Sequence, residues 1–134
     1  MMDVLVIDKT DQIKLGLVKS QANVQCTSDE VKALNILEQH SPVVVLLNTN
    51  VMQEQTAEYI EVLLKASSNS SIVVIADKLS DNGILKCLLA GAKGYQQLDQ
   101  LKRYSSRLIT AMNAGEAWIT RRMTATLLDS LRKY

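Results

Sequence analysis

The chain has 134 residues, of which 47% are hydrophobic and 22% are charged, and its formal net charge at pH 7 is +1. This length suits a single domain with one hydrophobic core, and the small charge excludes the strongly basic surface that many nucleic-acid-binding domains carry. No apolar run reaches the ~20 residues of a membrane span, and no secretory signal precedes the first predicted strand. We therefore expect a cytoplasmic protein that does not contact a membrane.

Strand-like and helix-like patterns alternate along the chain. The predicted strands cover residues 3–7, 23–27, 43–47, 72–76 and 93–96. Helical patterns cover about 11–20, 28–40, 56–67, 80–91 and 99–113, and a sixth follows over about 120–132. The segments 43–47 and 72–75 are apolar without interruption, which is typical of strands that are buried on both faces of a parallel sheet.

Several short signals place the ends of these helices. Thr27 and Glu30 have the spacing of a capping box, which predicts Thr27 as the N-cap of the second helix. Pro42 ends that helix, because proline disfavours helical backbone in the residue before it. Ser80 is predicted to cap the fourth helix, and Gly91 is predicted to close it.

The two cysteines, Cys26 and Cys87, lie far apart in the sequence. Two such residues are too few for a disulfide framework or a zinc site. We therefore predict that both are reduced thiols in or near the core.

The order of the elements predicts an α/β fold of the flavodoxin-like kind. Alternating strands and helices imply a five-stranded parallel sheet in the order 2-1-3-4-5, with helices on both faces. We assign residues 1–115 to this domain and residues 116–134 to an extra C-terminal helix and linker. Sites in such sheets form where the strands end at their carboxyl edge, and the polar run after the third strand begins there with Asn48.

Four segments carry a resemblance to a known family: residues 4–8, the third strand up to Asn48, residues 89–95 with the sequence Leu-Ala-Gly-Ala-Lys-Gly-Tyr, and residues 114–122. They resemble the receiver domains of bacterial response regulators, in the LuxR/NarL-type branch of transcription regulators. The resemblance implies a CheY-like regulatory domain that is not an enzyme. It also implies that DNA is reached only through a helix-turn-helix domain, which we expect after Tyr134. Whether the chain is an excised domain or a stand-alone one stays open.

The phosphorylation site of that family has five roles, and only one of them is kept here. The two adjacent acids that hold Mg²⁺ correspond to Asp8 and Lys9. The phosphoacceptor aspartate corresponds to Asn48, the hydroxyl residue after the fourth strand to Ala76, and the lysine after the fifth strand to Leu98. One carboxylate beside an ammonium is a poor Mg²⁺ site, and an amide is a poor nucleophile. We therefore expect regulation without phosphorylation, and no metal.

Lys9 has two interpretations. Its ammonium group either pairs with Asp8 or reaches Asn48 in place of the metal charge, or it is simply solvated. Exposed ion pairs contribute only ~0–1 kcal/mol to stability, so the sequence does not decide between the paired and the solvated interpretation of Lys9.

The segment Trp118-Ile119-Thr120-Arg121 also resembles an element by which some biofilm regulators with degenerate receivers bind cyclic di-GMP, although Ile119 departs from that pattern. In this interpretation the guanidinium group of Arg121 forms bidentate hydrogen bonds to phosphate or guanine, and Trp118 packs or stacks beside it. In the other interpretation Trp118 is a core anchor under the last helix. The alternative function is thus a cyclic di-GMP-sensing domain that uses Trp118, Thr120 and Arg121, with that dinucleotide as its one cofactor.

The last predicted helix carries apolar residues at helical spacing: Met123, Leu127, Leu128 and Leu131. With no sixth strand to cover, this stripe must pack on the helix at 99–113 or on another copy of the chain. Leu127 and Leu128 are adjacent, which indicates two apolar sides. We predict a symmetric homodimer built from this helix and its neighbour.

Overall fold

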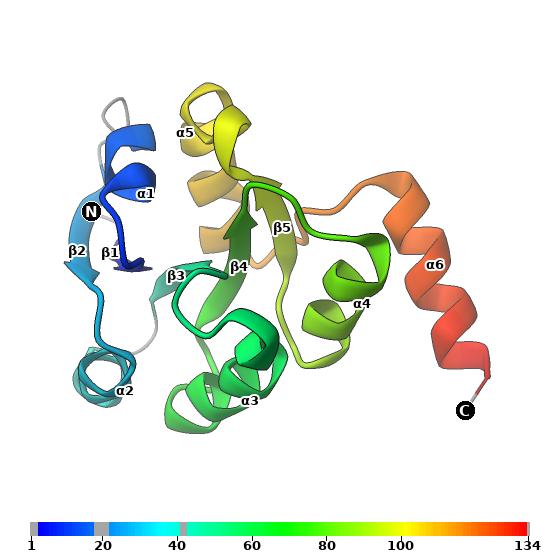
Figure 1. The fold of residues 1–134 in the computed structure, drawn as a ribbon, viewed down its shortest axis with the longest axis horizontal. Helices are drawn as coiled ribbons and strands as arrows, with labels where there is room; N and C mark the ends of the chain where they lie inside the picture. Colours follow the sequence, from blue (N-terminus) through cyan, green and yellow to red (C-terminus); the bar gives the residue numbers. More distant parts are fainter. Residues whose placement is uncertain (1–2, 18–21, 41–42, 134) are drawn as a thin grey trace.

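The computed structural model describes residues 3–17, 22–40 and 43–133. Its centre is a five-stranded parallel sheet in the predicted order β2-β1-β3-β4-β5 (Figure 1). The strands are β1 (Asp3–Ile7), β2 (Asn23–Thr27), β3 (Val44–Asn48), β4 (Ser71–Ala76) and β5 (Gly94–Gln97). The predicted flavodoxin-like α/β fold is therefore confirmed, with strand boundaries within about one residue of those expected from the sequence.

Helices cover both faces of this sheet. On one face lie α2 (Glu30–Gln39), α3 (Thr56–Ala66) and α4 (Asp81–Leu89), and on the other lie α1 (Gln12–Gly16) and α5 (Leu101–Asn113). Short 3-10 turns, η1 (Gln53–Gln55) and η2 (Leu98–Gln100), precede α3 and α5. The extra helix α6 (Arg121–Arg132) lies beside α4, at the side of the molecule away from β2 (Figure 1).

Two layers of core follow from the alternation of side chains along the buried strands. Leu5 and Ile7 of β1 pack toward α2 and α3, whereas Val4 and Val6 pack toward α1 and α5. All five residues of β3 are buried, as expected for a central strand that is covered on both faces. This rigid arrangement holds the carboxyl ends of β1, β3 and β4 side by side.

Two glycines are explained by close approach of another segment. A Cβ atom on Gly16 would lie 2.9 Å from Leu101 Cδ2, so this glycine lets α1 pack against the start of α5. A Cβ atom on Gly94 would lie 2.4 Å from the Trp118 carbonyl oxygen, because Trp118 forms a parallel bridge to Gly94 at the edge of the sheet. Neither reason is visible in the sequence.

Two local predictions are wrong: the N-cap of α2 and the burial of Cys26. The N-cap of α2 is Asp29 and not Thr27: the Asp29 Oδ1 accepts from the backbone N–H groups of Val31 and Lys32 at 2.8 and 3.0 Å. The Thr27 hydroxyl instead accepts from the Asp29 N–H. Cys26 is exposed because β2 is an edge strand, while Cys87 is buried as predicted.

The first helix is shorter than predicted. Helix α1 ends at Gly16, which is earlier than the predicted 11–20, and residues 18–21 lie outside the described part. Pro42, predicted to end the second helix, also lies outside the described residues.

Candidate functional site

The carboxyl edge of the sheet brings together the residues that the sequence singled out. Asp8 follows β1, Asn48 ends β3 and Ala76 ends β4, and all three are buried. Asp8 and Asn48 are only 5% and 4% exposed, so their polar groups must find partners within the protein.

Those partners converge on the carboxylate of Asp8. Its Oδ1 accepts hydrogen bonds from Asn48 Nδ2 and Asn50 Nδ2, each at 3.0 Å. The same oxygen accepts from the backbone N–H of Thr10 at 3.0 Å and from the Thr10 hydroxyl at 2.9 Å. Its Oδ2 accepts from the N–H of Ile13 at 3.1 Å. Both oxygens of the carboxylate are therefore already engaged by the protein itself.

Asn50 is a member of this cluster that sequence reasoning missed. Its backbone N–H donates to Asn48 Oδ1 at 3.0 Å, which turns the Nδ2 group of Asn48 toward Asp8. Its own Oδ1 accepts from the backbone N–H of Lys9 at 3.3 Å. A signal was present, because two asparagines separated by one residue directly follow a buried strand. We refer to Asp8, Asn48, Asn50, Thr10 and Ile13 below as the asparagine cluster.

Lys9 is exposed, and within the part of the chain that the structure describes its side chain forms no ion pair with Asp8. The amide group of Asn48, and not the ammonium group of Lys9, is what faces the carboxylate. Of the two interpretations of Lys9, the structure thus favours the solvated one.

The Mg²⁺ site of response regulators does not fit these residues. Mg²⁺ needs several oxygen ligands in octahedral geometry, usually including more than one carboxylate. Within residues 3–17, 22–40 and 43–133, no three side chains of His, Cys, Asp or Glu come together. Ala76 offers only a methyl group, and Leu98 packs against the core between the sheet and the helices α1 and α5. The residues at these positions therefore do not supply the ligands of that Mg²⁺ site.

A second candidate region is the connection to α6, which is fixed by Trp118. The Trp118 N–H donates to the Lys93 carbonyl at 2.9 Å, and the Tyr95 N–H donates to the Trp118 carbonyl at 3.1 Å. The indole Nε1 donates to Gln96 Oε1 at 2.9 Å, and the ring meets Tyr104 edge-on with centroids 6.5 Å apart. Trp118 therefore extends the sheet beyond β5 and also packs partly against the core between the sheet and the helices α1 and α5.

A pocket of about 460 Å³ opens beside this anchor and is lined by Tyr95, Gln96, Gln97, Gln100, Tyr104 and residues 117–120. Thr120 is the N-cap of α6, and its hydroxyl accepts from the Met123 N–H at 3.1 Å. Arg121 follows on the first turn of α6 and is exposed. The structure thus places Trp118, Thr120 and Arg121 close in sequence and space, but with Trp118 and Thr120 already engaged in structural hydrogen bonds.

Several solved structures share this architecture. The isolated REC domain of RcsB from Salmonella enterica serovar Typhimurium matches with a TM-score of 0.79 at 16% identity, over 96% of this chain and 99% of that one. A LuxR family DNA-binding response regulator from Silicibacter pomeroyi matches with 0.74 at 20% identity, over 91% and 99%. The RcsB response regulator of Salmonella typhimurium matches with 0.78 at 15% identity, over 95% of this chain and 69% of that one. The chain has a receiver fold. No protein-family model and no curated protein sequence matches it.

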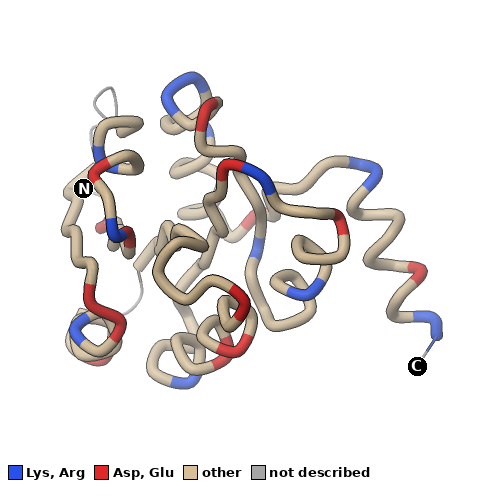
Figure 2. The backbone as a smooth tube through the Cα atoms, viewed as in Figure 1, with Lys and Arg blue, Asp and Glu red and all other residues tan. Residues whose placement is uncertain are grey.

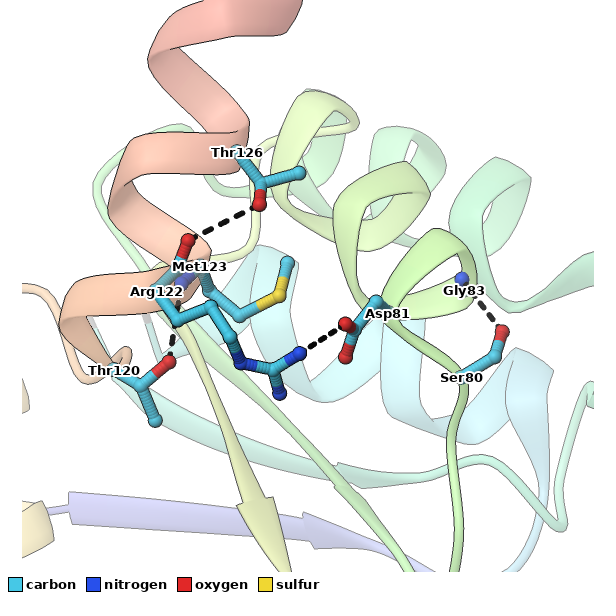
Figure 3. A network of polar contacts seen from close by, with 7 residues as sticks. All are labelled: Ser80, Asp81, Gly83, Thr120, Arg122, Met123 and Thr126. Carbon is cyan, nitrogen blue, oxygen red and sulfur yellow. Dashed lines mark hydrogen bonds and ion pairs between the residues drawn. The ribbon is translucent and has the colours of Figure 1, made fainter.

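Within the chain, α6 packs mainly on α4. We predicted packing on the helix at 99–113 or on another copy of the chain, so the partner within the chain differs from the predicted one. Met123 is 3% exposed, so it is buried within a single chain and is not part of the surface that α6 presents to solvent. Leu127 is partly buried, while Leu128 and Leu131 are 50% and 55% exposed. Figure 3 shows the contact, in which Arg122 forms an ion pair with Asp81 at the start of α4.

No helix in the described part of this receiver fold is long and apolar enough to cross a lipid bilayer.

Proposed function

We propose that this chain is a phosphorylation-independent, receiver-like regulatory domain that works by association and not by chemistry. The observation that supports this most strongly is the asparagine cluster, in which the carboxylate of Asp8 is satisfied by five hydrogen bonds from four residues of the same chain. An Asn48 amide at 3.0 Å from that carboxylate occupies the place where a phosphoacceptor and a metal would have to meet.

The proposed context is a LuxR/NarL-type transcription regulator in the cytoplasm. The Silicibacter pomeroyi neighbour is described as a DNA-binding regulator, and the longer RcsB neighbour has been described with respect to DNA interaction. About a third of that RcsB chain lies outside the matched region, since the match spans 69% of it. By analogy, we propose that this domain acts as a homodimer and influences DNA binding through an attached helix-turn-helix output domain.

Phosphorylation is tested by intact-mass spectrometry after incubation with acetyl phosphate and Mg²⁺. We expect no mass increase, because the amide of Asn48 is a poor nucleophile and Asp8 is already hydrogen-bonded. A receiver domain with an intact phosphoacceptor, treated in parallel, controls for the reagent. A stable phosphoryl adduct on any residue at the carboxyl edge of the sheet would overturn the proposal.

Dimerisation is tested through the exposed side of α6. Leu127, Leu128 and Leu131 are the predicted dimer residues on the exposed side of α6, whereas Met123, the fourth predicted member, is buried within the single chain. We expect the Leu128→Glu variant to sediment as a monomer at protein concentrations where the unmodified chain is a dimer. Val62→Glu is the matched control, because Val62 is also a half-exposed apolar residue but lies on α3. Identical sedimentation of all three folded proteins as monomers would exclude the dimer.

Cyclic di-GMP sensing is retained as a second candidate because of one feature beside the pocket. The guanidinium carbons of Arg103 and Arg107 lie 5.3 and 5.0 Å from the ring centroid of Tyr104, and Arg121 is exposed near the same pocket. Calorimetry with cyclic di-GMP tests it. We expect no binding, since the indole N–H of Trp118 is bonded to Gln96. Tight binding that is lost in Arg121→Ala would make this the primary function.

A further inference from the structure

The contact between α6 and α4 is small for an ordered helix. Among the residues of α6, only Met123 is fully buried. The ion pair between Arg122 and Asp81 adds a polar contact, but both side chains remain more than half exposed. Figure 3 shows these contacts concentrated on the first turns of the two helices. Within the described residues, α4 is also the element on which α6 packs most extensively.

Helix α6 is a poor helix by itself. It has 12 residues, and isolated helices of this length are marginal in water. Its first turn carries Arg121 and Arg122 and no acidic residue, which opposes the helix dipole, and Figure 2 shows this basic start. Thr124 and Thr126 lower its propensity further, because β-branched residues lose side-chain freedom in a helix. The helix therefore depends on a surface to dock on.

The point at which α6 can turn away from its own chain is narrow and well defined. Trp118 is tied to Lys93 and Tyr95 by backbone hydrogen bonds, and α6 begins at Arg121. Between these fixed points lie Ile119 and Thr120. A change of backbone torsions at these two residues redirects the helix without disturbing the sheet.

Large apolar side chains on the same two helices remain uncovered. Leu89 of α4 is 49% exposed, and Leu128 and Leu131 of α6 are 50% and 55% exposed. Together they offer apolar surface that the contact within one chain leaves in water. Each copy presents both a docking surface on α4 and a helix that fits it, so a second copy can offer the same contact as the chain's own helix.

We propose that two copies of this chain pair by exchanging α6, so that the helix of each copy docks on α4 of the other. The proposal rests on the association proposed above and specifies its surfaces. The fit needed between copies is the one already seen within a chain, with Met123 buried against α4 and Arg122 paired with Asp81. Exchange keeps these contacts, and it places the exposed leucines of both copies in one assembly, where any that meet across the pair favour association by leaving water.

Reversing one charge on each side tests the exchange directly. In Asp81→Arg, two arginines face each other across the contact, and in Arg122→Asp two aspartates do. In each single variant, the like charges at positions 81 and 122 therefore repel each other when α6 docks on α4 of the same chain. In a mixture, α6 of either variant meets an opposite charge only on α4 of the other variant. The double variant Asp81→Arg/Arg122→Asp restores attraction within one chain.

Sedimentation and native mass spectrometry of the full chains give the outcome. We expect the equal mixture to contain on the order of tenfold more dimer, in mixed form, than either variant forms by itself, since two weak pairs change from repulsive to attractive. The double variant should behave like the unmodified chain. Arg132→Asp, which changes an exposed charge at the far end of α6, should form no additional mixed dimer with Asp81→Arg.

The outcomes separate this inference from the proposed function. If the unmodified chain dimerises but the mixture shows no gain in mixed dimer, exchange is wrong and a symmetric contact through Leu128 stands. If the unmodified chain and the mixture are monomeric at all concentrations, both the exchange and the proposed homodimer fail. Labelling by acetyl phosphate leaves the exchange untouched and refutes only the absence of phosphorylation.

Discussion

The asparagine cluster and the α4–α6 contact differ in almost every physical respect. In the cluster, a carboxylate that is 5% exposed accepts hydrogen bonds from Asn48, Asn50, Thr10 and Ile13. In the α4–α6 contact, one buried methionine and one exposed ion pair hold a whole helix. The polar groups of the asparagine cluster are satisfied within the chain, whereas the α4–α6 contact leaves leucine side chains and an ion pair exposed to solvent. We therefore expect a change of association to involve α6 and to leave the asparagine cluster unchanged.

The largest expected effect comes from Asp8→Ala. The change leaves five donor groups, from four residues, without their acceptor in a buried site, and we expect a loss of unfolding free energy of about 3–5 kcal/mol. Urea denaturation measures it. Lys9→Ala is the matched control, since Lys9 is exposed and should change stability by less than about 0.5 kcal/mol. Equal effects of the two substitutions would show that the cluster does not stabilise the fold.

Asn48→Asp is expected to destabilise the protein and not to restore phosphorylation. It places a second carboxylate about 3 Å from Asp8 Oδ1, where the amide now donates, and we expect a cost of about 2 kcal/mol at pH 7. The repulsion requires both groups to be ionised, so the deficit should shrink as the pH falls into the range where carboxyl groups take up protons. Denaturation at pH 7 and pH 4.5 measures this. A variant that is stable at neutral pH and accepts a phosphoryl group would show that only the amide blocks the site.

Met123→Ala tests the α4–α6 contact. The loss of this buried side chain should cost about 2 kcal/mol, which is comparable to the whole docking energy expected of α6. We therefore expect hydrogen exchange to accelerate throughout α6 and to stay unchanged in β1, β3 and β4. Thr124→Ala, at an exposed position of the same helix, is the control. Accelerated exchange in the sheet as well would mean that α6 is part of the cooperative core.

The smallest effect concerns the exposed cap of α2. The backbone N–H groups of Lys32 and Val31 hold the pKa of Asp29 below its ordinary value of 3.8. A folded-state pKa that is lowered means that this carboxylate stabilises the protein above pH 3.8, and that the stabilisation disappears as the pH falls through the folded value. Asp29→Ala should therefore reduce thermal stability slightly at pH 7 and lose its effect at low pH. A pH-independent effect would indicate that the charge has no part in capping.

Much of the fold was predictable because long apolar runs such as 43–47 admit few alternatives to a buried parallel strand. The details that failed depend on partners that a pattern does not name. Thr27 and Asp29 are both good caps, and only the backbone path decides between them. Of the apolar stripe predicted on α6, Met123 is buried in a helix that packs mainly on α4, whereas the predicted partner was the helix at 99–113 or another copy.

The candidate site was predictable in composition and less so in its contacts. Asn48 was identified from its place after a buried strand, and Asp8 from the resemblance to receiver domains. Asn50 was missed, because nothing in the sequence shows that its side chain turns back toward β1. The need for glycine at positions 16 and 94 was likewise not predictable, since each glycine makes room for a residue far away in the chain.

Hydrogen exchange followed by mass spectrometry on the unmodified chain, with and without Mg²⁺ and beryllofluoride, tests the central contrast most directly. We expect the backbone N–H groups of Thr10, Ile13 and Asn50 to exchange slowly and to be unaffected by these additions, because the Asp8 and Asn48 side chains already accept from them. We expect α6 to exchange fast, and faster still at high salt, where the exposed ion pair between Arg122 and Asp81 is screened. Altered exchange around Asp8 on addition of Mg²⁺ and beryllofluoride, together with a strongly protected α6, would contradict the account.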